Sequence, residues 1–356
     1  MERGITILRD FRILVFCAML LSLYSNSFGQ KTSDTITIIG VGDIMPGTNF
    51  PNSTYLPPDS GKYLFTSVKD ILMDADITFG NLEGCFLNSG GVVKKCQDST
   101  KCYAFRIPTY FAVNLKEAGF DLLNLANNHS GDFGEVGRAS TMKNLDSMDV
   151  FYAGLKKCPY VIIRKNNLNI GFCGFSPFIN TINMMNIDSV KEIVHMLDSL
   201  CDIVIVSFHA GAEGATHNHI TRHSEIFYDE DRGNVYEFAH NVIDEGADIV
   251  FGHGPHVTRA IELYKNRFIA YSMGNFCTYA RFNLKDANGV APIIKVYVSN
   301  KGEFIKASAF SIIQKGEGGP QIDNSNSAVQ QLIELTNTDF PENLLKIDSD
   351  GSISKK

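Results

Sequence analysis

The sequence predicts a layered α/β domain, or more loosely an α+β one, and three observations support this fold class. Apolar runs typical of strands alternate with helix-like segments along most of the chain. The 356 residues are 44% hydrophobic and 20% charged, which is ordinary usage for a globular protein. No internal repeat or low-complexity linker divides the chain. We therefore expect a layered domain rather than a string of small modules.

The first 29 residues are typical of a secretory signal peptide. Arg3, Arg9 and Arg12 precede an apolar run from Ile13 to Leu23, and Ser27-Phe28-Gly29 places small residues around a cleavage point. The apolar run is shorter than the ~20 residues that span a bilayer, which favours cleavage over an uncleaved membrane anchor. We expect an exported protein of the periplasm or cell envelope.

From residue 35 onward, strand-like and helix-like segments follow one another. Strands are predicted at 35–41, 77–79, 122–125, 161–165, 169–175, 202–208, 247–251, 268–272 and 293–298, and helices at 63–73, 110–118, 134–148, 190–200, 235–245 and 325–335. Asn166-Asn167-Leu168 predicts a hairpin, and the continuously apolar run 202–208 predicts a strand covered on both faces. The Gly-rich stretch Lys315–Pro320 predicts a boundary between a main domain, residues 35–315, and a C-terminal helix and polar tail, residues 316–356.

The cysteine pattern predicts one disulfide. Cys17 lies in the signal segment, and disulfides form in the oxidising compartments to which such a segment leads. Cys96 and Cys102 flank a polar segment and are the predicted pair, with Cys85 as a competing partner. Cys173 and Cys201 lie in apolar runs, which favours buried, unreactive thiols.

Potential metal ligands follow five separate predicted strands. They are Asp43, Glu83, Asn128 with His129, His209, and His253 with His256. Open α/β sheets gather ligands at the carboxyl ends of their strands, so we expect these side chains to converge. Carboxylate, amide and imidazole groups together suit one or two divalent ions, such as Mn²⁺, Mg²⁺, Fe²⁺ or Zn²⁺. Each residue alone has a structural explanation, such as a turn or a helix cap, but their joint occurrence at successive strand ends does not.

Other polar residues are open to structural explanations. His217, His219 and His223 follow no predicted strand and favour a surface loop, while His195 and His240 lie within predicted helices. Arginines close to the site could bind a carboxylate or phosphate through two hydrogen bonds, and the candidates are Arg222, Arg232, Arg259 and Arg281.

Six motifs occur in the order of a known family. They are Gly42-Asp-Ile-Met-Pro-Gly47, Gly80-Asn-Leu-Glu83, Asn127-Asn-His129 with Asp132, Ser207-Phe-His209, Gly252-His-Gly-Pro-His256 and Tyr271-Ser-Met-Gly-Asn275. Together they resemble the CapA family, which is associated with poly-γ-glutamate capsule synthesis. That family is similar to the calcineurin-like metallophosphoesterase superfamily. The resemblance implies a four-layer αββα sandwich of the metallo-dependent phosphatase type.

The resemblance also implies roles for individual residues. Asp43 and His256 would bind one ion, Glu83 would bridge two ions, and the second ion would be bound by Asn128, His209 and His253. His129 would protonate a leaving group, and Asp132 would orient His129.

Three departures from the phosphoesterase pattern leave the number of ions open. Met45 stands where the Asp-x-His motif has its histidine, Glu83 where aspartate is usual, and Gly254-Pro255 where a single residue separates the two histidines. A site with one ion is the alternative, and it applies if His256 does not reach Asp43.

Two functions are compatible with these residues. The leading hypothesis is an exported metal-dependent hydrolase of capsule synthesis, in which a metal-activated water attacks a phosphoester or the linkage of an anionic polymer such as poly-γ-glutamate. The alternative is a non-catalytic envelope scaffold or polymer-binding subunit with a structural or vestigial metal. In both cases other capsule-synthesis proteins at the membrane are expected partners. A net charge of −7 without a basic stripe argues against nucleic acid.

Overall fold

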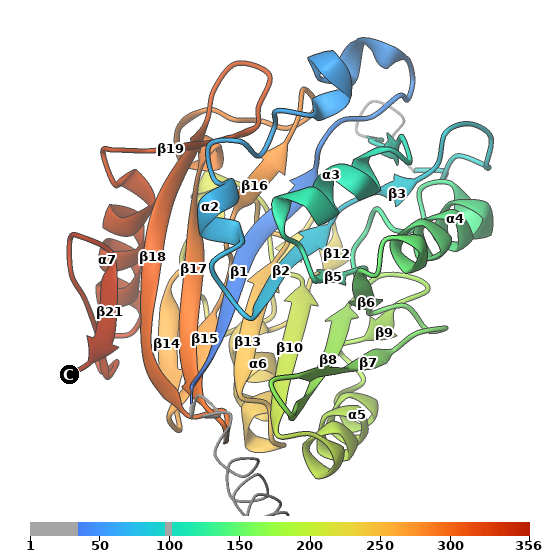
Figure 1. Cartoon of the computed structure of the whole chain (residues 1–356). Coiled ribbons are helices and arrows are strands. Elements are labelled where there is room, and N and C mark those ends of the chain that lie inside the picture. The colour runs from blue at the N-terminus through green and yellow to red at the C-terminus, as the bar shows by residue number, and fades with distance from the viewer. Residues whose placement is uncertain (1–34, 97–101) are drawn as a thin grey trace, which may run out of the picture. The chain divides into compact units, whose positions relative to one another are not determined.

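The computed structural model describes residues 35–96 and 102–356, and the chain from Thr35 to Lys356 forms one compact unit (Figure 1). The predicted signal segment, residues 1–29, lies outside the described residues. Within the described part of the chain, no helix has the length and apolar character needed to cross a bilayer.

Two large mixed sheets form the framework of this unit. The ten-stranded sheet has the order β20 (Leu345–Ile347), β21 (Ser352–Lys355), β18 (Phe304–Gln314), β17 (Val290–Ser299), β1 (Thr35–Met45), β2 (Ile77–Leu82), β5 (Leu122–Asn124) and β6 (Phe151–Ala153), with β16 (Asn275–Thr278) on β1 and β19 (Pro320–Ile322) on β18. The seven-stranded sheet has the order β14 (Ile261–Tyr264), β15 (Arg267–Ala270), β13 (Ile249–His253), β10 (Ile203–His209), β8 (Leu168–Ser176) and β7 (Tyr160–Lys165), with β9 (Ile182–Asn183) on β8. Two short ladders join β3 (Cys85–Phe86) with β4 (Arg106–Ile107) and β11 (Ile226–Phe227) with β12 (Glu230–Asp231).

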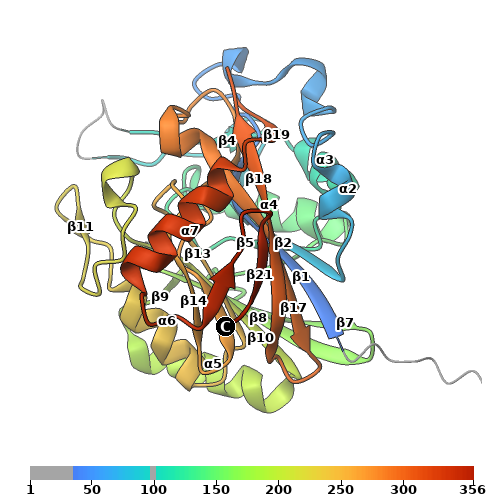
Figure 2. The same cartoon turned by 90° about the vertical axis from the view of Figure 1, so that its left-hand side faces the viewer.

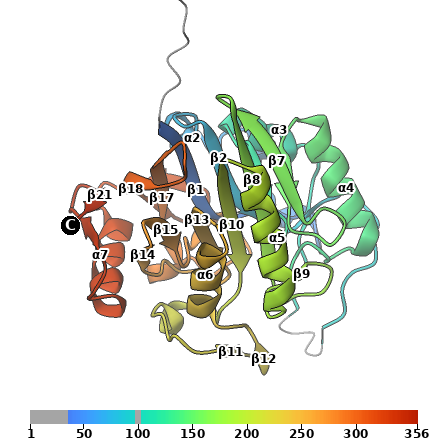
Figure 3. The ribbon, with the colours of Figure 1, turned by 90° about the horizontal axis from the view of Figure 1, so that it is seen from below.

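Helices cover the outer faces of both sheets, which confirms the four-layer arrangement (Figure 3). The ten-stranded sheet packs against α2 (Lys69–Leu72), α3 (Phe111–Ala118) and α4 (Gly134–Ser147) through one apolar cluster. The seven-stranded sheet packs against α5 (Ile187–Leu200) and α6 (Val235–Asp244) through another. Between the sheets lies a third cluster, in which the ring of Phe79 stacks on that of Phe251 at 5.4 Å. The sandwich is therefore held by burial of apolar side chains at three interfaces.

Parallel pairing brings the ends of the central strands to one edge of the sandwich. In the first sheet β1, β2 and β5 run parallel. In the second, β10 and β13 run parallel with His209 opposite His253. All seven residues of β10 are buried, as its continuous apolar run predicts. The polar residues that follow these strands therefore gather at a single edge, as expected for open α/β sheets.

Residues 316–356 differ from the predicted helix and polar tail. The helix is present as α7 (Ser327–Asp339), which contacts β17, β18 and β14 and lies along one side of the sandwich (Figure 2). The predicted tail is corrected to the two strands β20 and β21, because Leu345 and Ile353 insert into the core between the sheets. The predicted domain boundary at residue 315 is therefore absent, because one compact unit extends from Thr35 to Lys356.

Several local predictions can be compared with the structure directly. The disulfide between Cys96 and Cys102 is confirmed, and Cys85 is a buried free thiol. The predicted hairpin is confirmed as β7 and β8, with Asn166 and Asn167 both at positive φ in the turn. The predicted helix at 63–73 was too long, since only Lys69–Leu72 is α-helical and turns precede it.

Candidate metal centre

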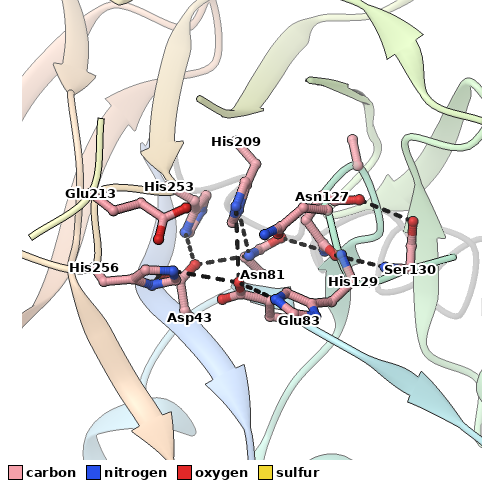
Figure 4. Close-up of polar contacts among 12 residues, drawn as sticks. Asp43, Asn81, Glu83, Asn127, His129, Ser130, His209, Glu213, His253 and His256 are labelled. Atoms are coloured by element: carbon pink, nitrogen blue, oxygen red, sulfur yellow. Dashed lines mark hydrogen bonds and ion pairs between the residues drawn. The ribbon is translucent and has the colours of Figure 1, made fainter. Parts of the chain in front are cut away.

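The predicted ligands come from both sheets and meet at the shared edge (Figure 4). Asp43 lies in β1, Glu83 directly follows β2, and Asn128 and His129 follow β5. His209 and His253 end β10 and β13, and His256 lies in the loop after β13. The side chains of Asp43, Glu83, His209 and His253 are fully buried. The convergence that the strand-end pattern predicted is therefore present.

Asp43, Glu83 and His209 form a group that could hold a metal ion. One ligand atom of each lies within 4.8 Å of the others. Both carboxylate oxygens of Glu83 and Nε2 of His209 are buried without a hydrogen-bond partner, and so are Oδ1 of Asn128 and both ring nitrogens of His253. Leaving so many buried polar atoms unpaired costs several kcal/mol unless something coordinates them. The donor set therefore fits a divalent cation.

His256 contacts Asp43, although two residues, Gly254 and Pro255, separate it from His253 where the phosphoesterase pattern has one. Its Nδ1 lies 2.9 Å from Oδ2 of Asp43, and its Nε2 lies 3.6 Å from Oε1 of Glu83. Gly254 makes this path possible, with φ of +112° and no room for a Cβ, which would lie 2.7 Å from the carbonyl oxygen of Ala210. Nδ1 of His253 lies 3.4 Å from Oδ1 of Asp43. Both histidines of the Gly252–His256 run therefore lie beside the carboxylate of Asp43.

Three asparagines form a hydrogen-bond network that contacts the ligands Asp43 and His209. The sequence did not predict a role for this network. Asn81 donates to Oδ1 of Asp43 at 2.8 Å and lies 3.1 Å from Nδ1 of His209. Its own Oδ1 accepts hydrogen bonds from Asn124 and Asn127. Asn127 in turn accepts from the backbone N–H groups of His129 and Ser130 through its Oδ1. Asn81 lies inside a motif already singled out, but its central position depends on the pairing of β1 with β2.

His129 is held at the rim of the cluster by Asp132 and Phe105. Its Nδ1 lies 2.8 Å from Oδ2 of Asp132, which also accepts from the backbone N–H of Phe105. The ring of Phe105 stacks on the imidazole with centroids 4.3 Å apart. Lys94, which the sequence reasoning missed, pairs with Oδ1 of Asp132 at 2.6 Å. The opposite nitrogen, Nε2, faces the cluster at 3.7 Å from Oε1 of Glu83.

Burial and pairing shift the protonation of these groups in different directions. Burial raises the pKa of Asp43, but its contacts with His253 and His256 outweigh burial and lower that pKa below its usual value. Burial lowers the pKa of His256, yet the charges of Glu83 and Asp43 outweigh it and raise the pKa to about 10. Burial raises the pKa of Glu83 and lowers that of His209, both strongly. These shifts favour a deprotonated Asp43 paired with a protonated His256, beside a neutral His209.

A cavity of about 420 Å³ opens beside the cluster. Its lining includes Asn128, His129 and His256, together with Glu213 from the loop after β10. The rest of the lining consists of aromatic rings, side-chain amides, one arginine and a short loop segment, namely Tyr103, Phe105, Phe227, Phe282, Asn275, Asn283, Asn288, Arg281, Gly214, Ala215 and Thr216. Glu213 was not predicted, although it follows His209 by only four residues. The cavity has the size of a small-molecule site.

Two of the histidines outside the centre have carboxylate partners. His219 lies 2.7 Å from Asp339, and His240 lies 2.9 Å from Glu262. Met45, where a phosphoesterase would have histidine, packs in the apolar cluster on the helix side of the ten-stranded sheet. The residue therefore points away from the centre.

Most of the chain matches one known protein family. The family described as "Bacterial capsule synthesis protein PGA_cap" matches residues 37–280. The chain belongs to this family. The matched region contains every predicted ligand of the centre, from Asp43 to His256.

Two relatives with known names are similar to the chain over much of its length. The capsule biosynthesis protein CapA of Bacillus anthracis is 29% identical over 267 residues, which cover 69% of this chain and 61% of that protein. The PGA biosynthesis protein CapA of Bacillus subtilis (strain 168) is 29% identical over 262 residues, covering 69% of this chain and 64% of that protein. The chain thus spans less than two thirds of either relative.

Solved structures show a looser likeness to this chain. A 5'-nucleotidase precursor from Thermus thermophilus has 11% identity and a TM-score of 0.43, covering 81% of this chain and 56% of that one. The purple acid phosphatase PPD1 from yellow lupin seeds has 8% identity and a TM-score of 0.41, covering 81% and 54%.

Proposed function

We propose that this chain is an exported, metal-dependent hydrolase of capsule synthesis, which acts on a phosphoester or on a linkage of an anionic polymer such as poly-γ-glutamate. The observation that carries this proposal is the position of His129. Its ring lines the cavity and faces the group formed by Asp43, Glu83 and His209, with Nε2 3.7 Å from Glu83. A centre that served only structure or polymer binding would have no use for an oriented acid at its rim.

Asp43, Glu83 and His209 would hold the metal, with Asn128, His253 and His256 as further ligands. A divalent ion bound there would supply Lewis-acid polarisation of the scissile group. Asn81 and its amide network hold Asp43 and His209 in place for this purpose.

His129 is suited to give a proton to the leaving group. Asp132 and Phe105 fix the ring so that Nε2 points to the cluster. Burial lowers the pKa of His129 and Asp132 opposes this effect. A substrate anion beside Nε2 would raise the pKa again and so favour the protonated ring.

Export and partners are part of the same proposal. The signal-like residues 1–29 support delivery to the periplasm or cell envelope. Because the chain spans only 61% and 64% of the two CapA relatives, the activity of those whole proteins is not transferred to it. We expect an anionic polymer or phosphoester as substrate, other capsule-synthesis proteins as partners, and no nucleic acid.

The test compares three variants of the purified full chain. His209→Ala should lose bound metal, measured by elemental analysis, and with it turnover of bis(p-nitrophenyl) phosphate or γ-linked polyglutamate. His129→Ala should keep its metal and lose about 100-fold to 10,000-fold in kcat, as expected for a general acid. His195→Ala, on the exposed face of α5, is the control and should change neither quantity.

The outcomes separate the hypotheses. Undiminished turnover in metal-loaded His209→Ala would refute the assigned centre. Stoichiometric metal in the unaltered chain without turnover of either substrate would support the non-catalytic scaffold instead.

A further inference from the structure

Arg281 differs from the other arginines that were candidates for substrate binding. Arg259 pairs with Glu225, Arg232 with Glu213 and Glu230, and Arg222 with Glu342. Within residues 35–96 and 102–356, the guanidinium of Arg281 makes no ion pair or hydrogen bond, and its Nε is buried without a partner. Its positive charge is therefore available to a ligand.

Two tyrosine rings hold the Arg281 guanidinium in place. The guanidinium carbon lies 4.6 Å from the ring centroid of Tyr55 and 5.0 Å from that of Tyr103. Contact with aromatic faces restricts the side chain without using its N–H donors, which suits a planar, bidentate anion receptor. Less conformational entropy is then lost when an anion binds.

Arg281 lies in the wall of the cavity beside the metal centre. The cavity also contains His129 and His256, so a ligand contacting Arg281 could reach the centre. Asn275 lines the same cavity, is only 1% exposed, and has no partner for its Oδ1. Its Nδ2 already donates to the backbone carbonyls of His256 and Asn288, so the unpaired oxygen is fixed as an acceptor.

We propose that Arg281 binds the anionic group of the substrate, a carboxylate or a phosphate, while Oδ1 of Asn275 accepts a hydrogen bond from a neighbouring N–H or O–H. This subsite rests on the proposed function and specifies the chemistry of its substrate. A γ-linked glutamate unit fits the pair because its α-carboxylate and its amide N–H are attached to the same carbon. A phosphoester presents its anion to Arg281.

Binding, measured independently of turnover, tests the subsite. Calorimetry of the metal-loaded full chain would use a γ-linked glutamate trimer, the same trimer with its α-carboxylates converted to carboxamides, and phenyl phosphate. Arg281→Gln should weaken binding of an anionic probe about tenfold or more, since charge-assisted bidentate pairs are the strong hydrogen bonds. The control is Arg164→Gln, because Arg164 is exposed on β7 and its guanidinium donates to the side chain of Asn169, away from the cavity.

The two trimers and the variant form a cycle. In the unaltered chain the carboxamide trimer should bind as weakly as the acid trimer binds to Arg281→Gln, and the variant should not distinguish the two trimers. Arg281→Lys, which keeps the charge but not the planar fork, should restore part of the affinity and serves if the glutamine variant fails to fold. Metal content and circular dichroism confirm that each variant is intact.

Each result of this experiment either supports or overturns the subsite. Equal affinity of Arg281→Gln and the unaltered chain for every anion overturns the subsite, as does an unaltered chain that binds neither anion. Dependence on Arg281 for phenyl phosphate alone supports the subsite and identifies a phosphoester. Arg281-dependent binding without any turnover supports the subsite while refuting the hydrolase.

Discussion

Replacing Arg259 by alanine should cost about 3–5 kcal/mol of unfolding free energy, because it breaks a buried ion pair. Arg259 is 0% exposed and donates to both carboxylate oxygens of Glu225, at 2.8 and 2.7 Å, and to the carbonyl of Ala212 at 3.1 Å. Glu225 also accepts from the backbone N–H of Ala212. The variant would leave the Glu225 carboxylate without its counter-charge inside the protein. It would also release the loop that carries Glu213 beside the centre.

Urea unfolding followed by far-ultraviolet circular dichroism measures this loss, since the chain has no tryptophan to report by fluorescence. Arg138→Ala is the control, because Arg138 pairs with the half-exposed Glu135 and such surface pairs contribute less than about 1 kcal/mol. Arg259→Leu combined with Glu225→Leu should be less destabilising than Arg259→Ala, since the cost comes from one unpaired charge. Equal losses for Arg259→Ala and Arg138→Ala would refute this reasoning.

Three further predictions concern other parts of the chain. Gly254→Ala should lose bound metal, because its Cβ would meet the backbone of Ala210 at 2.7 Å, whereas Gly316→Ala, at positive φ but with open space, should keep the metal seen by elemental analysis. Removing the disulfide with Cys96→Ser and Cys102→Ser should cost about 2 kcal/mol in urea unfolding, as expected for so short a loop, and an unchanged midpoint would argue against it. Burial raises the pKa of Asp248 from 3.8 to about 7 against the hydrogen bond from Val204 and the charge of Arg267, so between these pH values the folded chain keeps a proton that the unfolded chain has released. Stability should then fall with rising pH in this window by at most about 4 kcal/mol, and Asp248→Asn should remove this loss, whereas parallel urea midpoints for both proteins would contradict it.

The sequence predicted the parts of the centre that local pattern determines. Strand ends are visible as apolar runs that stop at polar residues, and this pattern located Asp43, His209 and His253 in one place. The disulfide was predictable because its cysteines flank a short polar loop.

Features that depend on tertiary neighbours were missed. Asn81 becomes central only because β1 pairs with β2, and Lys94 reaches Asp132 across 38 residues of chain. The strands β20 and β21 each offer few apolar residues, so their place in the sheet is decided by the exposed edge of β18 rather than by their own pattern. Whether His256 reaches Asp43 depended on the backbone conformation at Gly254, which sequence spacing does not specify.

The centre draws on both sheets, and the contact between Asp43 and His256 joins positions 213 residues apart. A nascent or partly folded chain cannot assemble such a centre, because β1 and β13 must both be in place first. A chain threaded across a membrane in the unfolded state would therefore arrive empty and take up its ion from the fluid in which it finishes folding. Supply in that compartment, as much as the ligand set, would then decide which metal is bound.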